Sequence, residues 1–521
     1  MQSLGSGVGS WPARRALLTP ERPAVRHGQR VLTHAELATR VASLARGFRR
    51  LGVARGDRVA YLGGNSAAFL ETMFAVLRLG AVFVPLNTRL AVAELAYMLD
   101  DSGSRLLVAG PDKLDDARAA VADAGSVERL LSVVATPGLM DLDSVAEDGE
   151  VGAPPLVHED DTALIVYTSG TTGRPKGARL THRNLTANTL NQLAHLDVLS
   201  TDVTLAVAPL FHMGGLGLLV LPTLLKGGQV VIVEAFDPAG LLGLIDEVGA
   251  TTFFAVPTML AAMADHPAWP SARLDSLRMV FYGGSPVAGP VAAAWLARGY
   301  PLVQGYGMTE ASPGVLLALP ERAADHPTSP GVPHLFTDVG LRVDGAVQWP
   351  PLPGATGELV IRGPNVFPGY WNRLAETAAA FDAEGWFGTG DVARAGADGW
   401  FTIVDRVKDM IISGGENIYP AEVEAVLGQH PAVAECAVVP VPDPRWGEVG
   451  LAFVLPRPGT AVDPDEVNAF LRDRLAGYKV PRHIRIVTQL PRNAMGKLVR
   501  PELRRTASEL LAPSPDAAPP A

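Results

Sequence analysis

The stretch ALIVYTSGTTGRPKG, residues 163–177, joins an apolar strand to a loop that is rich in phosphate-binding groups. Its first five residues, Ala163–Tyr167, are apolar enough to form a buried strand. The ten that follow, Thr168–Gly177, contain four small hydroxyl side chains, three glycines, one Arg and one Lys. Glycines let backbone N–H groups approach a phosphate closely, while the hydroxyls and the Lys176 ammonium add hydrogen bonds and charge. The stretch therefore predicts a phosphate-binding loop at the end of a buried strand.

This loop differs from the common nucleotide P-loop. That motif has Gly-Lys-Ser/Thr leading directly into a helix, whereas Pro175 precedes and Gly177 follows Lys176 in this chain. Because Pro175 cannot lie inside a helix, we expect the loop to stay open. The plainer alternative is a flexible surface turn, but such a turn does not require this density of phosphate-binding groups.

Apolar runs alternate with helical patterns between residues 58 and 282, which predicts parallel sheets with crossover helices. From Gly340 to Ile403 the pattern changes to short strands with Gly-rich turns, which indicates a smaller antiparallel β region. After Asp405, a strand and a helix that starts near Pro420 indicate a separate α+β domain. We therefore predict an α/β fold made of a large N-terminal domain over 1–405, a hinge over 406–408, a small mobile α+β C-terminal domain over 409–506 and a disordered tail over 507–521.

The 521 residues are 48% hydrophobic and 19% charged, so the chain can bury large cores in spite of its 54 Gly and 43 Pro. The single cysteine, Cys436, excludes an internal disulfide framework and a multi-cysteine zinc or iron–sulfur site. We expect a cytoplasmic location and no signal peptide, because the N-terminus lacks a compact apolar core. The longest apolar run, residues 214–225, suits a buried helix, so we expect no integral membrane segment, with transient membrane contact left open.

The net charge of −10 argues against a general nucleic-acid coat, but the charge is unevenly distributed. Residues 471–505 contain ten Lys or Arg and two Asp or Glu, which gives a local charge of +8. This segment is either a solvated basic face or a binding surface for a small molecule with several phosphates. Nucleic acid is poorly supported, since Tyr478 is the only Phe, Tyr or Trp in the segment.

The loop Thr168–Gly177 resembles the signature loop of the adenylate-forming superfamily, which includes acyl-CoA synthetases, adenylation domains of peptide synthetases and luciferases. The resemblance covers about residues 15–506 and is nearest to fatty-acyl-CoA synthetases. Five further motifs are similar to those of the family and occur in its order: Gly283–Pro286, Gln304–Glu310, Gly385–Asp391, Asp405–Asn417 and Pro491–Lys497.

The resemblance implies a reaction in two halves. A carboxylate attacks the α-phosphorus of ATP and pyrophosphate leaves; a thiol then attacks the acyl-adenylate and AMP leaves. The first half concentrates negative charge, so it needs cations, a metal and oriented donors. We therefore expect an acid–thiol ligase with Mg²⁺ as cofactor and with ATP and coenzyme A as co-substrates.

By the same resemblance, three residues are catalytic. Lys497 reaches the carboxylate and the α-phosphate, Thr309 contacts the α-phosphate, and Glu310 holds Mg²⁺, which takes few protein ligands. Asp391 is expected to accept hydrogen bonds from the ribose hydroxyls, with Arg406 assisting. The expected ATP and AMP site comprises Thr168, Ser169, Gly170, Thr171, Thr172, Gly173, Lys176, Gly283, Gly284, Ser285, Gly305, Tyr306, Gly307, Thr309, Asp391, Arg406 and Lys497.

Lys408 matches the hinge position of the family, where rotation would replace Lys497 at the active site with a channel for the thiol. Tyr478 is expected beneath the adenine of coenzyme A and Arg482 near its ribose phosphate, with Trp446 as a weaker candidate. The expected coenzyme A site comprises Gly414, Gly415, Glu416, Trp446, Tyr478 and Arg482.

The acid is expected to bind between apolar walls and small glycines. No Arg or Lys occurs in these segments, which disfavours a malonate-like acid. Phe211-His212 stands where peptide-synthetase domains have a Phe-Asp pair, which disfavours an amino acid. We expect a medium- or long-chain fatty acid, with a benzoate- or cinnamate-like aryl acid as the nearest alternative. The expected pocket residues are Phe211, His212, Met213, Gly215, Val256, Tyr282 and Gly283.

Two other functions stay open at this point. An acyl-AMP ligase that loads the phosphopantetheine of a carrier protein would not need the coenzyme A site around Tyr478 and Arg482. A catalytically inactive sensor of acyl-adenylates is disfavoured by the intact Lys176, Glu310 and Lys497. The expected partners are a small carboxylic acid, ATP and coenzyme A, without nucleic acid, in a monomer or homodimer.

Replacing Lys497 with Ala is expected to slow acyl-adenylate formation by about 10²–10³, the usual effect of losing one charged partner of a transition state. Thioester formation from supplied acyl-adenylate should survive, because the lysine is assigned to the first half-reaction alone. Single-turnover measurement of each half-reaction checks this, and an equal loss in both would refute the assignment.

Overall fold

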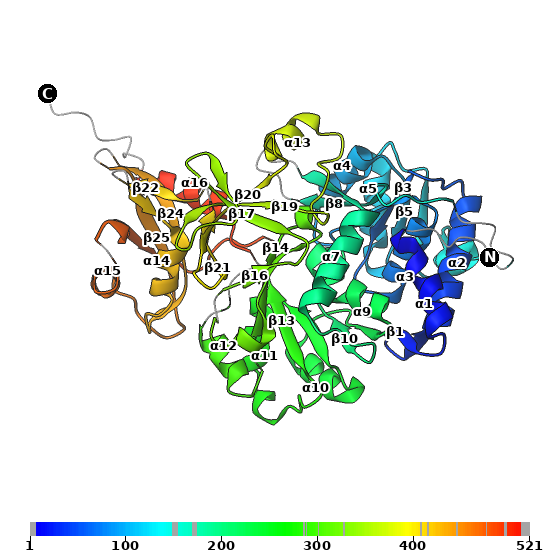
Figure 1. The fold of residues 1–521 in the computed structure, drawn as a ribbon, viewed down its shortest axis with the longest axis horizontal. Coiled ribbons are helices and arrows are strands. Elements are labelled where there is room, and N and C mark those ends of the chain that lie inside the picture. The colour runs from blue at the N-terminus through cyan, green and yellow to red at the C-terminus, as the bar shows by residue number, and fades with distance from the viewer. Residues whose placement is uncertain are drawn as a thin grey trace. The chain divides into compact units, whose positions relative to one another are not determined.

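The computed structural model of the chain describes residues 7–147, 149, 155–168, 175–284, 287, 289–300, 302–326, 329–406, 409–413, 416–443, 446–475, 477–493 and 497–511, with the backbone alone at 406, 412, 416 and 417. The chain divides into two compact units. The first comprises residues 1–340, 360–388 and 398–401, and the second comprises 341–359, 389–397 and 402–521. Figure 1 labels the elements of both units.

A mainly parallel sheet of seven described strands carries the phosphate loop. The strands β3 to β8 pair in parallel, as predicted for this part of the sequence, whereas β8 and β9 form an antiparallel hairpin. The order is β7 (Met140–Asp141), β6 (Arg129–Ser132), β5 (Ser104–Ala109), β3 (Arg58–Leu62), β4 (Val82–Leu86), β8 (Thr162–Thr168) and β9 (Lys176–Thr181).

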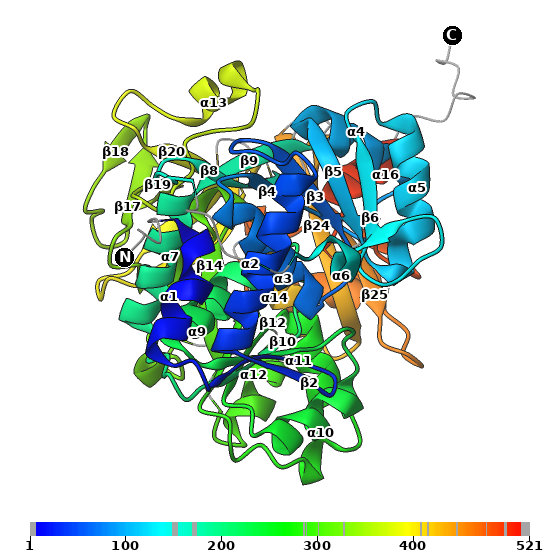
Figure 2. The ribbon, with the colours of Figure 1, turned by 90° about the vertical axis from the view of Figure 1, so that its right-hand side faces the viewer.

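Alternation along β3 explains why this strand is apolar after its first residue, Arg58. Ala60 and Leu62 pack in the cluster that includes the helices α4 (Val92–Ser102) and α5 (Leu114–Asp123), which Figure 2 shows beside β5 and β6. Successive side chains point to opposite faces, so Tyr61 instead contacts Phe69 of α3 (Ala67–Arg78) at 5.1 Å between ring centroids. Helices therefore cover both faces, as is typical of parallel sheets.

A second sheet of nine described strands lies in the same unit. Its central strands β11, β10, β12, β13 and β14 pair in parallel, and the strands at its ends add antiparallel pairs. The order is β16 (Val332–Pro333), β15 (Gly314–Leu317), β14 (Leu302–Gly307), β13 (Met279–Gly283), β12 (Thr252–Ala255), β10 (Val203–Ala206), β11 (Gln229–Ile232), β1 (Pro23–His27) and β2 (Arg30–Thr33).

The helices of the first unit connect and cover these sheets, and several begin with capping residues that the sequence supplies, such as Thr33 before α2 and Thr181 before α7. They are α1 (Trp11–Leu18), α2 (His34–Arg50), α3 (Ala67–Arg78), α4 (Val92–Ser102), α5 (Leu114–Asp123), α6 (Leu142–Val145), α7 (His182–His195), α8 (Met213–Gly215), α9 (Leu221–Lys226), α10 (Pro238–Val248), α11 (Pro257–Ala264), α12 (Gly289–Leu296) and α13 (Leu374–Ala380).

Two smaller sheets account for most of the second unit. One has the order β18 (Ala346–Gln348), β17 (Asp338–Val343), β19 (Thr356–Arg362), β20 (Phe387–Ala395) and β21 (Phe401–Arg406). The other has the order β23 (Glu416–Ile418), β22 (Ile411–Ser413), β25 (Gly447–Pro456) and β24 (Val433–Asp443), with β26 (His483–Ile486) beside β25. The helices α14 (Pro420–Leu427), α15 (Pro464–Arg472) and α16 (Arg500–Leu511) complete the unit. The predicted mixed α/β fold with small antiparallel sheets and a C-terminal α+β domain is confirmed.

The end of the described chain differs from the sequence prediction. A disordered tail was expected from residue 507, but α16 continues to Leu511. The reason is burial, since Leu503 and Ala507 pack against Val439 and Leu451 of the neighbouring strands. The predicted boundary after residue 405 stays a prediction. None of the helices in the described ranges is long and apolar enough to cross a membrane.

Candidate functional site

The two described ends of the phosphate loop are held together by the hairpin register. Thr168, the last residue of β8, is paired with Lys176, the first residue of β9. The loop residues Ser169, Gly170, Thr171, Thr172 and Gly173 lie outside the described residues. Their phosphate-binding role therefore stays a prediction, while the position of Lys176 can be analysed directly.

Lys176 and Glu310, two predicted site residues far apart in the sequence, are connected by one tyrosine. The ammonium of Lys176 lies 4.7 Å from the centroid of the Tyr370 ring, within the range of a cation–π contact. The hydroxyl of Tyr370 donates a hydrogen bond to Oε1 of Glu310 at 3.0 Å. Glu310 is buried, and its carbonyl accepts the Phe367 backbone N–H at 2.8 Å. The structure thus brings the loop lysine and the proposed metal ligand to one site.

Tyr370 belongs to a segment that we call the strap, defined as residues 369–373. The strap runs beside β9, because the Trp371 N–H donates to the Gly177 carbonyl at 2.7 Å and the Arg179 N–H donates to the Gly369 carbonyl at 3.1 Å. Gly369 has a φ of +139°, and an added Cβ would come within 2.4 Å of Thr377. Only glycine therefore allows this path.

Sequence analysis missed Tyr370. Burial, and after it the neighbouring Glu310 carboxylate, raise the pKa of Tyr370 well above its usual range. The hydroxyl therefore stays protonated and acts as a donor toward Glu310. A signal was present, since an aromatic pair, Tyr370-Trp371, directly follows a glycine, but nothing local linked it to residue 310.

The predicted adenine-site residues lie at the carboxyl ends of two neighbouring parallel strands, where α/β sheets commonly bind ligands. Gly283 of β13 is paired with Gly305 of β14, and a Cβ on Gly283 would come within 2.9 Å of the Gly305 carbonyl. A Cβ on Gly307 would come within 1.9 Å of the Pro313 carbonyl. Tyr306 is half-buried between these glycines. Gly284 is also described, whereas Ser285 lies outside the described residues.

Thr309 and Glu310 begin a short 3₁₀ turn that directly follows β14. The turn closes at Ser312, whose N–H donates to the Thr309 carbonyl at 3.0 Å. The buried amide of Asn365 donates to the carbonyls of Ala311 at 3.1 Å and of Gly314 at 2.8 Å. The residues proposed for the α-phosphate and the metal are therefore held from both sides.

A single buried carboxylate suits the proposed metal. Among the described ranges, no three His, Cys, Asp or Glu side chains gather into a metal-binding cluster. Mg²⁺ usually takes one or two carboxylates together with waters and substrate phosphates. Glu310 beside the loop lysine fits that donor set, with Tyr370 fixing the orientation of the carboxylate.

The predicted acyl-pocket residues follow the carboxyl ends of β10 and β12 in the same sheet. Phe211 and Met213 are buried, His212 and Val256 are half-buried, and the rings of Phe211 and His212 lie 4.6 Å apart. Gly215 is buried where a Cβ would come within 2.2 Å of the Pro209 carbonyl.

Tyr282 is fully buried in a hydrophobic cluster with Phe253 and Trp295, and its hydroxyl donates to Gln304 at 2.8 Å. It is therefore well placed to support the end of β13, next to Gly283. The part of Tyr282 in lining an acid pocket stays a prediction.

The predicted ribose anchor lies in the second unit. Asp391 is 9% exposed on β20, and Arg406 ends the neighbouring strand β21, with its side chain outside the described residues. The turn before Asp391 is fixed by Thr389, whose hydroxyl donates to the Leu359 carbonyl at 2.7 Å. The Gly390 N–H donates to Glu358 at 3.2 Å. Neighbouring strands thus carry the two residues that were expected to act together.

Lys497 is exposed and lies just before α16. The Lys497 N–H donates to the Asn493 side chain at 3.0 Å, and the Asn493 N–H donates to the Lys497 carbonyl at 2.8 Å. One turn of helix later, Arg500 donates twice to Glu424 at 2.9 Å, and Arg504 pairs with Asp409 at 2.8 Å. The hinge residue Lys408 lies outside the described residues.

Three residues of the expected coenzyme A site lie near one end of the β22–β25 sheet. The Trp446 N–H donates to Asp443 at 2.9 Å, and the Arg482 guanidinium lies 4.0 Å from the same carboxylate. Tyr478 is 45% exposed on a turn that contacts β23, the strand that contains Glu416. Gly414 and Gly415 lie outside the described residues, as does the side chain of Glu416.

Comparison with known proteins gives two matching family models. The model described as AMP-binding enzyme matches residues 13–371, and the model described as AMP-binding enzyme C-terminal domain matches residues 422–497. Feruloyl-CoA synthase of Amycolatopsis sp is 52% identical over 499 residues, which is 96% of this chain and 99% of that protein.

Two solved structures also match over almost the whole chain. O-succinylbenzoate CoA synthetase from Bacillus subtilis, in complex with its acyl-adenylate intermediate, has a TM-score of 0.83 at 34% identity, covering 95% of this chain and 97% of that one. A fatty acyl CoA synthetase of Mycobacterium tuberculosis has a TM-score of 0.78 at 33% identity, covering 97% and 99%.

Replacing Tyr370 with Phe should slow ATP–pyrophosphate exchange about tenfold at limiting Mg²⁺, because Glu310 loses a charge-assisted hydrogen bond of roughly 1.5–3 kcal/mol. Raising Mg²⁺ should recover part of the rate, since the ring beneath Lys176 remains. The matched control is Tyr300→Phe, which removes a hydroxyl bonded to the Leu274 carbonyl at 2.7 Å. A Tyr370→Phe enzyme that behaves like this control at every Mg²⁺ concentration would disprove the role of the hydroxyl.

Proposed function

The chain belongs to the AMP-binding enzymes of the adenylate-forming superfamily and is an AMP-forming acid–thiol ligase, and from this premise we propose that its acid is an aryl acid of the hydroxycinnamate type, such as ferulate. The observation that carries the proposal is the 52% identity to feruloyl-CoA synthase over 96% of the chain. The fatty acyl CoA synthetase named above is 33% identical. We therefore propose an aryl acid as the substrate, in place of the fatty acid that the sequence motifs favoured.

Packing around the glycine run supports a compact acid. A Cβ on Gly217 would come within 2.9 Å of Pro313, and one on Gly215 would meet the Pro209 carbonyl. A Cβ on Gly214 would lie 3.4 Å from the Phe254 ring. The small size of these glycines therefore serves mainly to let neighbouring segments pack closely. This packing leaves less space in the acid pocket for a long alkyl chain than the sequence suggested. Aromatic and apolar neighbours such as Phe254 suit a planar ring.

The first half-reaction follows from the site residues. Lys176 and the predicted loop donors offset the charge of the ATP phosphates, and Lys497 is proposed to bind both the acid carboxylate and the α-phosphate. Glu310 would hold Mg²⁺, which when bound neutralises phosphate charge. Tyr370 keeps the Glu310 carboxylate oriented. These residues position the carboxylate oxygen for attack on phosphorus and stabilise pyrophosphate as it leaves.

The second half-reaction is proposed to use coenzyme A. The basic segment 471–505 and the grouping of Trp446 and Arg482 around Asp443 suit a ligand with several phosphates. The C-terminal domain 409–506 is proposed to turn about the hinge 406–408 between the halves, so that Lys497 leaves and the thiol enters. Coenzyme A, rather than a carrier protein, is also the acceptor in the names of the three relatives described above. A cytoplasmic location remains a proposal that rests on the single cysteine.

An acid series at fixed ATP, Mg²⁺ and coenzyme A tests the substrate proposal. We expect kcat/KM for ferulate and related hydroxycinnamates to exceed that for octanoate and palmitate by at least about 10²-fold, because losing the fit of a ring costs several kcal/mol. Thioester formation is measured directly by absorbance or mass spectrometry. A preference for either fatty acid would overturn the aryl assignment, and turnover with pantetheine-loaded carrier protein alone would overturn coenzyme A.

Replacing Lys408 with Pro is expected to slow thioester formation at least about tenfold while acyl-adenylate formation changes little, because fixing φ removes the backbone rotation. Lys408→Ala is the matched control, since it removes the same side chain and leaves the backbone free. Stopped-flow measurement of both half-reactions distinguishes the variants. Equal rates for the Pro and Ala variants in the second half would refute a hinge at this residue.

A further inference from the structure

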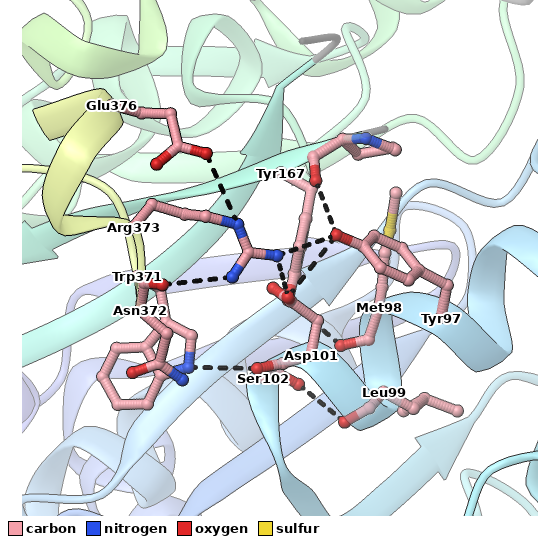
Figure 3. Close-up of polar contacts among 11 residues, drawn as sticks. Tyr97, Met98, Leu99, Asp101, Ser102, Tyr167, Trp371, Asn372, Arg373 and Glu376 are labelled. Atoms are coloured by element: carbon pink, nitrogen blue, oxygen red, sulfur yellow. Dashed lines mark hydrogen bonds and ion pairs between the residues drawn. The ribbon is translucent and has the colours of Figure 1, made fainter. Parts of the chain in front are cut away.

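Asp101, near the end of α4, has a buried carboxylate that receives partners from distant parts of the chain (Figure 3). Its side chain is 9% exposed and forms an ion pair with Arg373. The Tyr167 hydroxyl donates to Oδ2 at 2.9 Å, and the Tyr97 hydroxyl lies 3.4 Å from Oδ1. Because a buried carboxylate is costly unless it is paired and hydrogen-bonded, these partners depend on one another.

These partners lie on both sides of the phosphate loop. Tyr167 directly precedes Thr168, so its hydroxyl anchors the strand from which the loop leaves. On the other side, the Tyr97 hydroxyl donates to the Pro175 carbonyl at 3.2 Å and accepts a hydrogen bond from Arg373 at 3.1 Å. The Asp101 carboxylate is therefore linked to each end of the loop through one tyrosine.

The strap joins this network to the Glu310 site. The indole N–H of Trp371 donates to the backbone carbonyl of Asp101 at 3.2 Å, and Arg373 supplies the ion pair. Tyr370 directly precedes Trp371 in the strap. Its hydroxyl donates to Glu310, and its ring contacts the Lys176 ammonium. A displaced Asp101 network would therefore shift both the loop lysine and the residue that orients the metal ligand.

Tyr167 keeps its proton in this network. Burial, and after it the Asp101 carboxylate, raise the pKa of Tyr167 well above its usual range, so its hydroxyl remains a donor. The Met98 carbonyl, at 3.1 Å, is a second acceptor for that hydroxyl. Tyr167 thus remains a hydrogen-bond donor at the end of β8, next to Thr168.

We propose that Asp101 is a positioning residue for Thr168 and Lys176, and that it sets the affinity of the enzyme for ATP through Tyr167, Tyr97 and Arg373. The proposal rests on the proposed nucleotide role of the loop, and it does not depend on the identity of the acid. Asp101 acts by fixing the positions of Thr168 and Lys176, the two described ends of the loop.

The test is Asp101→Asn, which keeps the size of the side chain and removes its charge. Titration of the whole enzyme with Mg-ATP, without any acid, should show about a tenfold rise in Kd, and KM for ATP should rise with it. KM for the acid and the rate of thioester formation from supplied acyl-adenylate should stay within about twofold. Arg373→Lys, which keeps the cation, should lose less ATP affinity than Arg373→Met.

The matched control is Asp202→Asn. Asp202 is another buried carboxylate, 1% exposed, that pairs with Arg278 at 2.8 Å and accepts from the Thr251 hydroxyl at 2.8 Å. It precedes β10, at the amino end of the strand, away from the carboxyl ends that carry the site. Asp202→Asn should lower thermal stability to a similar degree and leave the Kd for Mg-ATP unchanged.

Three outcomes would overturn the proposal: an unchanged Kd for Mg-ATP in Asp101→Asn, an equal change in both Asp variants, or a KM for the acid that rises as much as that for ATP. If Asp101→Asn fails to fold, Tyr167→Phe removes one hydroxyl from the same network and should raise the Kd about threefold. A wrong acid assignment would show in the acid series and leave the ATP titration as expected.

Discussion

The antiparallel register that pairs Thr168 with Lys176 is the constraint on which the active region depends. It closes a hairpin at the edge of an otherwise parallel sheet, so the phosphate loop must leave and return at one place. It also exposes the outer edge of β9, where the strap hydrogen-bonds through Trp371 and Gly369. A strand at the edge of a sheet has backbone N–H and C=O groups on its outer side that can form hydrogen bonds with another segment. Without that register, Tyr370 could not lie between Lys176 and Glu310.

Two buried carboxylates, Glu310 and Asp101, flank the strap, and each accepts a hydrogen bond from a tyrosine whose pKa is raised. The raised pKa means that the neutral hydroxyl is retained through the whole range in which the enzyme works, so both carboxylates keep their donors. Glu310 also lies near a lysine, because the Lys176 ammonium contacts the ring of the same Tyr370. A carboxylate and an ammonium on either side of one tyrosine suit a site that binds a divalent cation together with phosphates.

The sequence alone was sufficient for the parts of the site that are local. The β8 strand, the parallel strands up to β13 and the start of α14 at Pro420 were predicted, because each depends on residues within about ten positions. The phosphate-binding role of the loop stays a prediction. Tyr370 and Asp101 were missed, since their partners lie 60 and 272 positions away and no spacing rule connects them. The identity of the acid could not be predicted from the sequence either. The glycines near residue 215 suggested an open pocket, but Gly215 and Gly217 pack closely against Pro209 and Pro313.

The role proposed for Lys497 agrees with what the two half-reactions require. Acyl-adenylate formation needs a cation at the α-phosphate, whereas the thiol must later reach the same carbonyl, so a lysine fixed beside Lys176 would obstruct the second half. Within the second unit, Lys497 is exposed, yet its backbone forms two hydrogen bonds with Asn493, one to the Asn493 side chain and one from the Asn493 N–H. Arg500 and Arg504 of the following helix pair with Glu424 and with Asp409, the first described residue after the proposed hinge. A lysine that is held rigidly within its own unit can move with that unit as a whole, as the proposed rotation about the hinge requires.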